Sequence, residues 1–120
     1  MQTDTRVAVD QINDVAGRLV TVLRFAGDIS STSREAVLGS YQSLSKIDHP
    51  RILLDFSKVD YINSSGIALV IQVLLEASRS DQRVGIFGLT AHFRKVFTMV
   101  GITKYTTLYA DEATAVAAFE

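Results

Sequence analysis

The sequence alternates between short β-rich runs and segments in which apolar residues recur at helical spacing, and this alternation constrains the fold most strongly. Strands separated by a helix lie parallel in one sheet, because the crossover returns the chain to the same end. The first two β-rich runs, at residues 6–11 and 18–25, have only turn residues between them and predict an antiparallel hairpin. The chain is therefore predicted to be an α/β domain of order β-β-α-β-α-β-α-β-α.

The remaining elements follow from periodicity and turn chemistry. Gly27 is expected to break the second strand, and a helix is expected to begin at Thr32, which forms a capping box with Glu35, and to end before Pro50. Further strands are predicted at 52–56, 84–87 and 106–109, and further helices at 64–80, 90–101 and 111–119. The expected architecture is a mixed, mostly parallel sheet of about five strands, with about four helices mainly on one face.

The helix predicted at 64–80 carries more apolar residues than one face requires. Its core stripe is expected at i, i+3, i+4, i+7 and i+8, namely Ile67, Val70, Ile71, Leu74 and Leu75. Four more apolar residues lie off this stripe: Ala68, Leu69, Val73 and Ala77. They indicate either an exposed docking patch or a second contact beneath a neighbouring helix or loop, and the sequence does not decide between these.

Length and composition exclude several classes of function. At 120 residues the chain is predicted to form one domain, residues 1–120. Its 12 Lys and Arg against 13 Asp and Glu give a net charge of −1, which argues against binding nucleic acid through bulk charge. The absence of cysteine excludes disulfides, thiolate metal sites and a cysteine nucleophile.

No enzyme, cofactor or metal site is predicted. Ser64 and Ser65 lack a Gly-x-Ser-x-Gly setting, and nothing pairs either serine with His49 or His92. The two histidines are also too far apart in sequence to form a metal signature. The polar N-terminus shows no secretory signal, and the apolar stretch at 67–75 is too short to span a membrane. A cytoplasmic protein without membrane insertion is expected.

The most informative segment is residues 55–67, where an apolar strand leads through small polar residues into an amphipathic helix. Ser64 and Ser65 fall at the helix N-terminus, where free N–H groups and the helix dipole favour an anionic oxygen. A phosphoryl group there would add about −1.5 to −2 charge without melting the helix, and Gly66 would allow a close approach. Asn63, Ser64 and Ser65 are also ordinary capping residues, and from the residues alone this pattern is more typical of a simple N-cap than of a switch.

This segment resembles the signature of STAS domains, the family of bacterial anti-sigma factor antagonists. The resemblance extends more weakly to Gly27-Asp28-Ile29, to residues 93–97 and to Val100-Gly101-Ile102. The residues that match the central signature are Leu53, Leu54, Asp55, Ser57, Val59, Ile62, Asn63, Ser64, Ser65, Gly66 and Ile67.

The resemblance implies partner switching. In such families the unphosphorylated antagonist binds an anti-sigma factor that is itself a serine kinase; phosphorylation releases the complex, and a serine phosphatase restores the antagonist. By position, the phosphoacceptor is Ser64. The residues expected to bind the partner are Asp28, Ser30, Asn63, Ser65, Gly66, Ile67, Leu69 and Val73.

Two positions depart from the family pattern, and both bear on the switch. Asn63 and Ser30 stand where the best-known members carry acids, although Asp28 is close to Ser30 in the sequence. If either acid assists the transfer, phosphorylation is expected to be slower or lost, while the fold is unaffected. The alternative function is a STAS scaffold or small-ligand sensor in which Ser64 only caps the helix.

Overall fold

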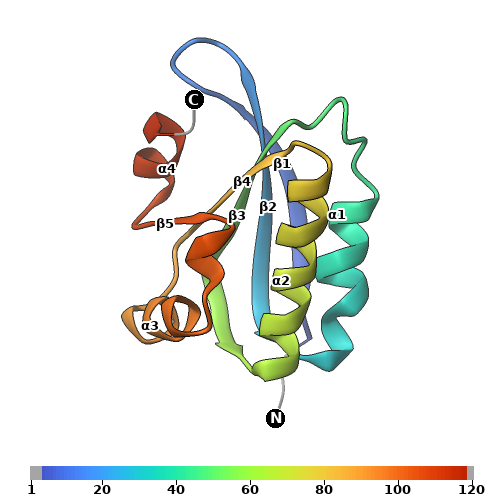
Figure 1. Ribbon diagram of the computed structural model, residues 1–120, viewed down its shortest axis with the longest axis vertical. Coiled ribbons are helices and arrows are strands. Elements are labelled where there is room, and N and C mark those ends of the chain that lie inside the picture. The colour runs from blue at the N-terminus through green and yellow to red at the C-terminus, as the bar shows by residue number, and fades with distance from the viewer. Residues whose placement is uncertain (1–3, 119–120) are drawn as a thin grey trace.

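The computed structural model describes residues 4–118 and contains one five-stranded sheet in the order β1-β2-β3-β4-β5 (Figure 1). β1 runs antiparallel to β2, whereas the other neighbouring strands are parallel. This confirms the predicted mixed sheet with an N-terminal hairpin. The strands are β1 (Arg6–Asn13), β2 (Leu19–Ile29), β3 (Arg51–Ile62), β4 (Arg83–Phe87) and β5 (Thr107–Tyr109).

The helical segments follow the predicted order, with differences at their ends. The helix expected from Thr32 is a succession of short turns that ends at Gln42, and its capping box is formed by Ser30 and Ser33 instead of Thr32 and Glu35. The predicted last helical residue, Phe119, lies outside the described residues. The segments are η1 (Ser31–Ser33), η2 (Glu35–Gly39), α1 (Ser40–Gln42), α2 (Ser64–Arg79), α3 (Ala91–Met99), η3 (Ile102–Lys104) and α4 (Glu112–Ala118).

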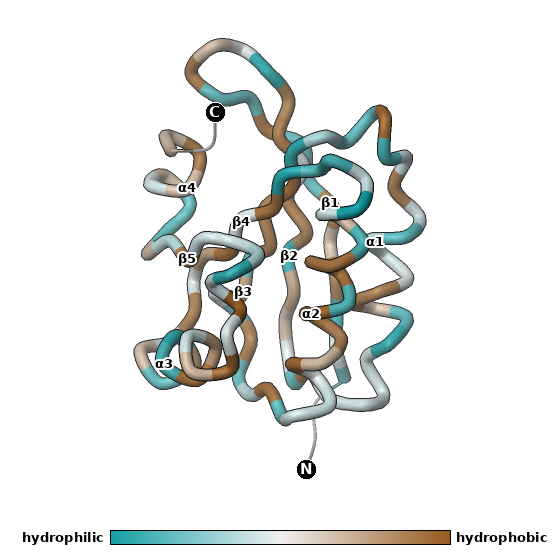
Figure 2. Tube along the Cα trace, viewed as in Figure 1, coloured by the Kyte–Doolittle hydropathy of each residue, from teal (hydrophilic) through white to brown (hydrophobic). Residues whose placement is uncertain are grey.

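The sheet separates two apolar layers of unequal size. Leu54 and Phe56 of β3 point into the larger layer, which α1, α2 and α3 cover, and the Phe56 ring contacts Phe97 at a centroid distance of 6.0 Å. Leu53 points to the opposite face, where it packs with Ala115 of α4. Figure 2 shows hydrophobic residues both on the strands and on the helices that cover them. Among the described residues, α1, α2 and α3 lie on one face and α4 on the other, which agrees with the prediction of helices mainly on one face.

β2 and β3 are both longer than predicted, and their extensions position the candidate site. Gly27 does not end β2: it lies inside the strand at φ +89°, next to irregularities in the register with β3. β3 continues through residues 57–62, which were expected to form a loop, because Val59 and Ile62 are buried against the core. The glycine therefore bends the strand, and both strands end beside the start of α2.

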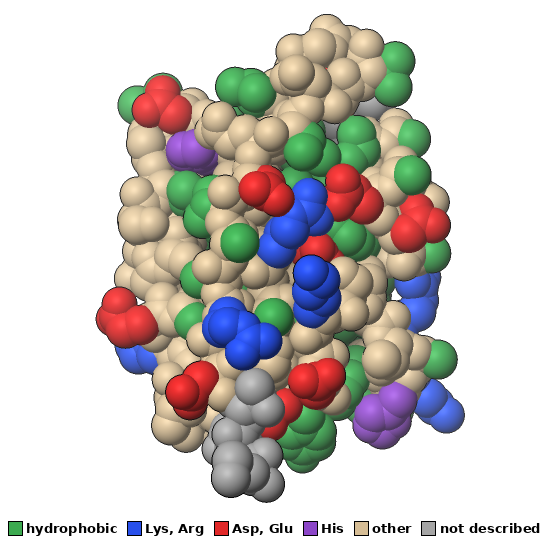
Figure 3. Space-filling view, turned by 180° about the vertical axis from the view of Figure 1, so that it is seen from behind, with side chains coloured by type: hydrophobic (Ala, Val, Ile, Leu, Met, Phe, Trp, Pro, Cys, Tyr) green, Lys and Arg blue, Asp and Glu red, His purple; other side chains and the backbone are tan. Residues whose placement is uncertain are grey.

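Ion pairs link the strands to one another and to α4 on the face of the sheet that α4 covers. Arg24 of β2 contacts Asp55 of β3 at 3.0 Å, Asp10 of β1 at 2.6 Å and Glu112 of α4 at 2.6 Å. These partners raise the pKa of Arg24, with the hydrogen bond to Glu112 as the largest cause. Figure 3 shows this face, on which basic and acidic side chains gather next to one another over the sheet. The guanidinium thus joins three neighbouring strands to the C-terminal helix.

Asp14, in the turn after β1, is a second anchored carboxylate. It accepts a hydrogen bond from the backbone N–H of Arg18 at 2.9 Å and one from the Arg51 side chain at 2.7 Å. These bonds, with the Arg18 N–H contributing most, lower the pKa of Asp14 to about 2. The hairpin is thereby fastened to the start of β3.

No helix within residues 4–118 combines the length and the apolar character needed to cross a lipid bilayer.

Candidate functional site

Ser64 begins α2 at the point where β3 ends, and Asn63 fixes this junction. The side chain of Asn63 accepts a hydrogen bond from the Gly66 N–H at 2.9 Å, and its backbone N–H donates to the carbonyl of Ile29 at 3.1 Å. The first bond caps α2, and the second ties the cap to the end of β2. The sequence predicted capping by this segment, and the structure confirms it for Asn63. The expectation that Ser64 caps the helix is wrong, because Ser64 is the first residue inside α2 and its side chain makes no cap bond within residues 4–118.

Gly66 allows the first turn of α2 to lie directly against β2. A Cβ at this position would lie 2.4 Å from the carbonyl oxygen of Ile29 and 2.8 Å from its carbonyl carbon. Both are backbone atoms, so they cannot move aside as a flexible side chain would. Close approach at Gly66 was predicted, but the atoms that approach belong to the protein's own strand.

The two serines themselves face solvent. Ser64 and Ser65 are exposed, and within residues 4–118 neither hydroxyl has a hydrogen-bond partner. The first turn of α2, all of it in the described part of the chain, contains no Asp or Glu. Its N–H groups and the positive end of the helix dipole therefore favour a negative group at this position.

The end of β2 contributes the neighbouring surface. Asp28 is in register with Tyr61 of β3, and Ile29 with Ile62, so the β2 end lies beside the junction that leads to Ser64. Asp28 is partly exposed, whereas Ser30 is 5% exposed and its hydroxyl caps η1. Ser30 was expected to touch the partner, but its side chain serves the local fold.

Two further residues predicted to bind the partner are buried. Leu69 is 6% exposed and Val73 is 1% exposed, and both belong to the main core with Ala77. The interpretation of these residues as a docking patch is therefore wrong, and the alternative of a second buried contact is correct. The spacing of the apolar residues predicted that this segment is helical, but it did not predict which sides of the helix are buried. Two sides are buried, because α2 packs against both the sheet and η2.

The rotation of α2 leaves a smaller apolar surface beside the serines. Ile67 is half-buried and Ala68 is exposed. Tyr61, which the sequence analysis did not single out, is 56% exposed and packs edge-on against Phe93 of α3 at 6.0 Å. No sequence signal marked Tyr61, since residues 57–62 were expected to form a loop. We call Asp28, Tyr61, Asn63, Ser64, Ser65 and Ile67 the Ser64 surface.

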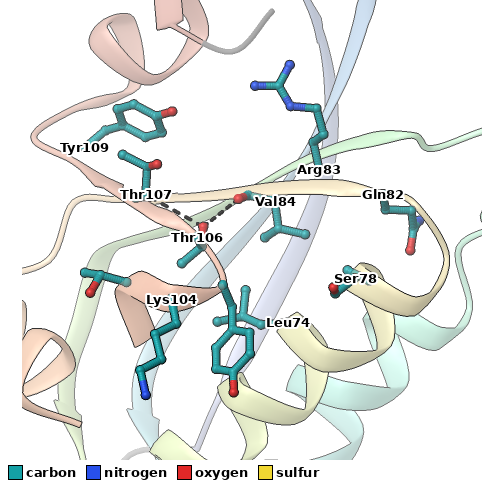
Figure 4. A pocket seen from close by; sticks show the side chains of 12 residues that line it. Leu74, Ser78, Gln82, Arg83, Val84, Lys104, Thr106, Thr107 and Tyr109 are labelled. Carbon is teal, nitrogen blue, oxygen red and sulfur yellow. Dashed lines mark hydrogen bonds between the residues drawn. The ribbon is translucent and has the colours of Figure 1, made fainter. Parts of the chain in front are cut away.

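A separate pocket lies at the other end of α2. It has a volume of about 380 Å³ and is formed by the last turns of α2 together with β4, η3 and β5 (Figure 4). Its lining includes Ser78, Gln82 and Thr106, and the Thr106 hydroxyl donates to the carbonyl of Val84. In the described part of the chain no three His, Asp or Glu side chains are placed to hold a metal ion. The Ser64 surface remains the candidate for function.

Comparison with known proteins identifies the family. Residues 14–109 match the family model described as "Mlab, STAS domain", and the chain belongs to this family. It is also similar to the "Putative anti-sigma factor antagonist BtrV" of Bordetella bronchiseptica, with 24% identity over 115 residues, which cover 96% of this chain and 95% of that protein.

Solved structures share the fold. An anti-sigma factor antagonist from Mycobacterium paratuberculosis superimposes with a TM-score of 0.81 at 16% identity, covering 99% of this chain and 98% of that one. The phosphorylated form of the Bacillus cell fate determinant SpoIIAA gives a TM-score of 0.65 at 17% identity, covering 89% and 94%. These similarities confirm the predicted STAS fold.

Proposed function

We propose that this protein is a cytoplasmic anti-sigma factor antagonist whose affinity for a serine-kinase anti-sigma factor is switched by phosphorylation of Ser64. The observation that carries the proposal is the exposed Ser64 hydroxyl at the N-terminus of a helix whose first turn is fixed to the sheet. The antagonist named among its relatives covers almost the whole chain, which supports the same role here. In this role the protein is the substrate of the kinase and not itself a catalyst.

A phosphoryl group on Ser64 should change the charge of the surface without disturbing the fold. Asn63 and Gly66 anchor the first turn independently of the Ser64 hydroxyl, so modification of that hydroxyl breaks no hydrogen bond within the described chain. The helix N-terminus also stabilises the added negative charge. We therefore expect the phosphorylated protein to keep its fold.

Phosphorylation of Ser64 is expected to weaken binding to the partner strongly. Without phosphate, the Ser64 surface offers neutral hydroxyls beside the partly apolar faces of Tyr61 and Ile67. A phosphoryl group adds about −1.5 to −2 charge there, and burying that charge at an interface carries a large desolvation cost. Phosphorylation should therefore release the partner, and removal of the phosphate by a serine phosphatase should restore binding.

Asn63 caps α2 without placing a negative charge beside Ser64, as an aspartate at this position would. Asparagine and aspartate both cap helices well, so the fold of this junction does not require an acid. An uncharged cap repels a neighbouring phosphate less than a carboxylate would. If an acid at this position assists the kinase, Asn63→Asp should accelerate phosphorylation without weakening the helix.

The test is phosphorylation by the cognate kinase, sought first among the products of neighbouring genes. Wild-type protein, Ser64→Ala and the matched control Ser65→Ala are incubated with the kinase and ATP, and phosphopeptides are mapped by mass spectrometry. We expect phosphate on Ser64 in the wild type and in Ser65→Ala, and none in Ser64→Ala. Undiminished labelling of Ser64→Ala would overturn the assignment of the acceptor.

A second measurement separates the switch from a constitutive scaffold. If the protein is a scaffold in which Ser64 only begins α2, with Asn63 as the cap, Ser64→Asp should leave partner affinity nearly unchanged. The switch predicts a large loss of affinity for the same variant.

A further inference from the structure

β1 is an edge strand of the sheet, with an open outer side. β1 stands first in the strand order and pairs with β2, and no strand within residues 4–118 covers its other side (Figure 1). Most of its residues are exposed, including Val9, of which 49% is accessible. An open strand edge is a template for pairing with another strand.

The hydrogen-bond pattern of the hairpin shows which residues point outward. The Asp14 N–H donates to the Arg18 carbonyl at 2.9 Å, and the register runs without interruption from that turn to Arg6 opposite Ala26. In an antiparallel pair, alternate residues bond to the partner strand. The even-numbered residues of β1 therefore bond to β2, while Val7, Val9 and Gln11 direct their N–H and C=O groups to the open edge.

The side chains of β1 are complementary to a second copy of the same strand. When two β1 strands pair antiparallel about Ala8, each Val7 lies opposite Val9 of the other copy, and each Arg6 lies opposite Asp10 of the other copy. The valines occupy the positions that exchange hydrogen bonds, and the charges occupy the closer, non-hydrogen-bonded positions. Two-fold symmetry makes every one of these contacts twice.

Neighbouring registers lack this match. Centring the pair on Asp10 places the two Asp10 carboxylates opposite each other, and centring it on Val7 places Asp4 opposite Asp10. Centring it on Val9 leaves Arg6 opposite Ile12. Like charges directly across an antiparallel pair are destabilising. The charge pattern thus selects the register about Ala8.

The charged groups are available for this contact. Arg6 is exposed and makes no ion pair within residues 4–118. Asp10 contacts Arg24 at 2.6 Å, but 53% of its side chain remains exposed. A second cation can therefore reach Asp10 without displacing the first.

We propose that this protein forms a homodimer in which β1 pairs antiparallel with β1 of a second copy about Ala8, joining the two sheets into one. The two β1 strands run in opposite directions, so the two Ser64 surfaces lie at opposite ends of the joined sheet. The dimer therefore leaves both surfaces accessible, and it is independent of the function proposed above.

Sedimentation velocity over a concentration series tests the proposal through charge reversal. Arg6→Glu and Asp10→Lys each place like charges across the pair, so each variant alone should dissociate at least roughly tenfold more readily than the wild type. An equimolar mixture of the two variants should regain the dimer. In the mixed pair the introduced glutamate of one copy faces the introduced lysine of the other, and the unchanged Asp10 faces the unchanged Arg6.

Val9→Pro supplies a control that acts on the backbone. It removes an outward N–H of β1 but none that bonds to β2, so circular dichroism should show a retained fold while the dimer is lost. A wild-type protein that stays monomeric at all concentrations, or a mixture that fails to restore the dimer of folded variants, would overturn the proposal. So would a folded Val9→Pro protein that dimerises as well as the wild type.

Discussion

Replacing Gly66 with alanine should loosen the junction that presents Ser64. The new Cβ would lie 2.4 Å from the Ile29 carbonyl oxygen, about 1 Å closer than an ordinary van der Waals contact. To relieve the clash, α2 must move away from β2, which strains the 3.1 Å bond from the Asn63 N–H to the same carbonyl. Overpacking costs about 1–3 kcal/mol, and the lost hydrogen bond adds about 1 kcal/mol, whereas alanine regains up to about 1 kcal/mol of helix propensity.

The expected net loss is about 2 kcal/mol in the free energy of unfolding, measured by urea denaturation. Gly39→Ala is the matched control, because Gly39 has helical torsions and its added Cβ would meet the flexible side chain of Glu35 at 2.8 Å. That side chain can rotate away, so Gly39→Ala should be neutral or stabilising by up to about 1 kcal/mol. A Gly66→Ala protein as stable as Gly39→Ala would show that the added Cβ does not force α2 away from β2.

Three further changes test other parts of the structure. Asn63→Ala removes the cap on Gly66 and should cost about 1 kcal/mol in thermal or urea unfolding, whereas Asn63→Asp should cost nothing. Because the folded pKa of Asp14 is lowered to about 2 from 3.8, its stabilising effect is complete above the ordinary value and disappears as pH falls through about 2. The difference in free energy of unfolding between wild type and Asp14→Asn should therefore shrink as the pH falls from about 4 to about 2. A difference that does not change with pH would contradict this role of Asp14. Arg24→Met leaves the buried Asp55 carboxylate without its cation and should lower the free energy of unfolding by about 2 kcal/mol. Because the substitution also removes the contact with Glu112, amide hydrogen exchange should accelerate more in α4 than in α2.

Local patterns in the sequence predicted the order of elements, because each strand and helix carries its own periodicity. The start of α2 at Ser64, and its end within one residue, followed directly from such signals. The lengths of β2 and β3 did not, since residues 26–29 and 57–62 become strands by pairing with each other across the sheet. Pairing of that kind is a tertiary interaction, which local sequence does not record.

The candidate site divides in the same way. Ser64 and Asn63 were predicted at a helix N-terminus because capping chemistry is local. The burial of Leu69 and Val73 was not predicted, because the rotation of α2 depends on its packing against both η2 and the sheet. Tyr61 was not predicted to belong to the Ser64 surface, because it lies in the part of β3 that was expected to be a loop.

The proposed switch is a change of charge at Ser64 that alters partner binding while the fold persists. The most direct test is calorimetric titration of the anti-sigma kinase with wild-type protein and with protein phosphorylated at Ser64, alongside the unfolding curves of both. We predict at least a roughly hundredfold weaker complex after phosphorylation, with the unfolding midpoint nearly unchanged. Equal affinities for the two forms, or loss of the cooperative unfolding transition on phosphorylation, would exclude a switch of this kind at Ser64.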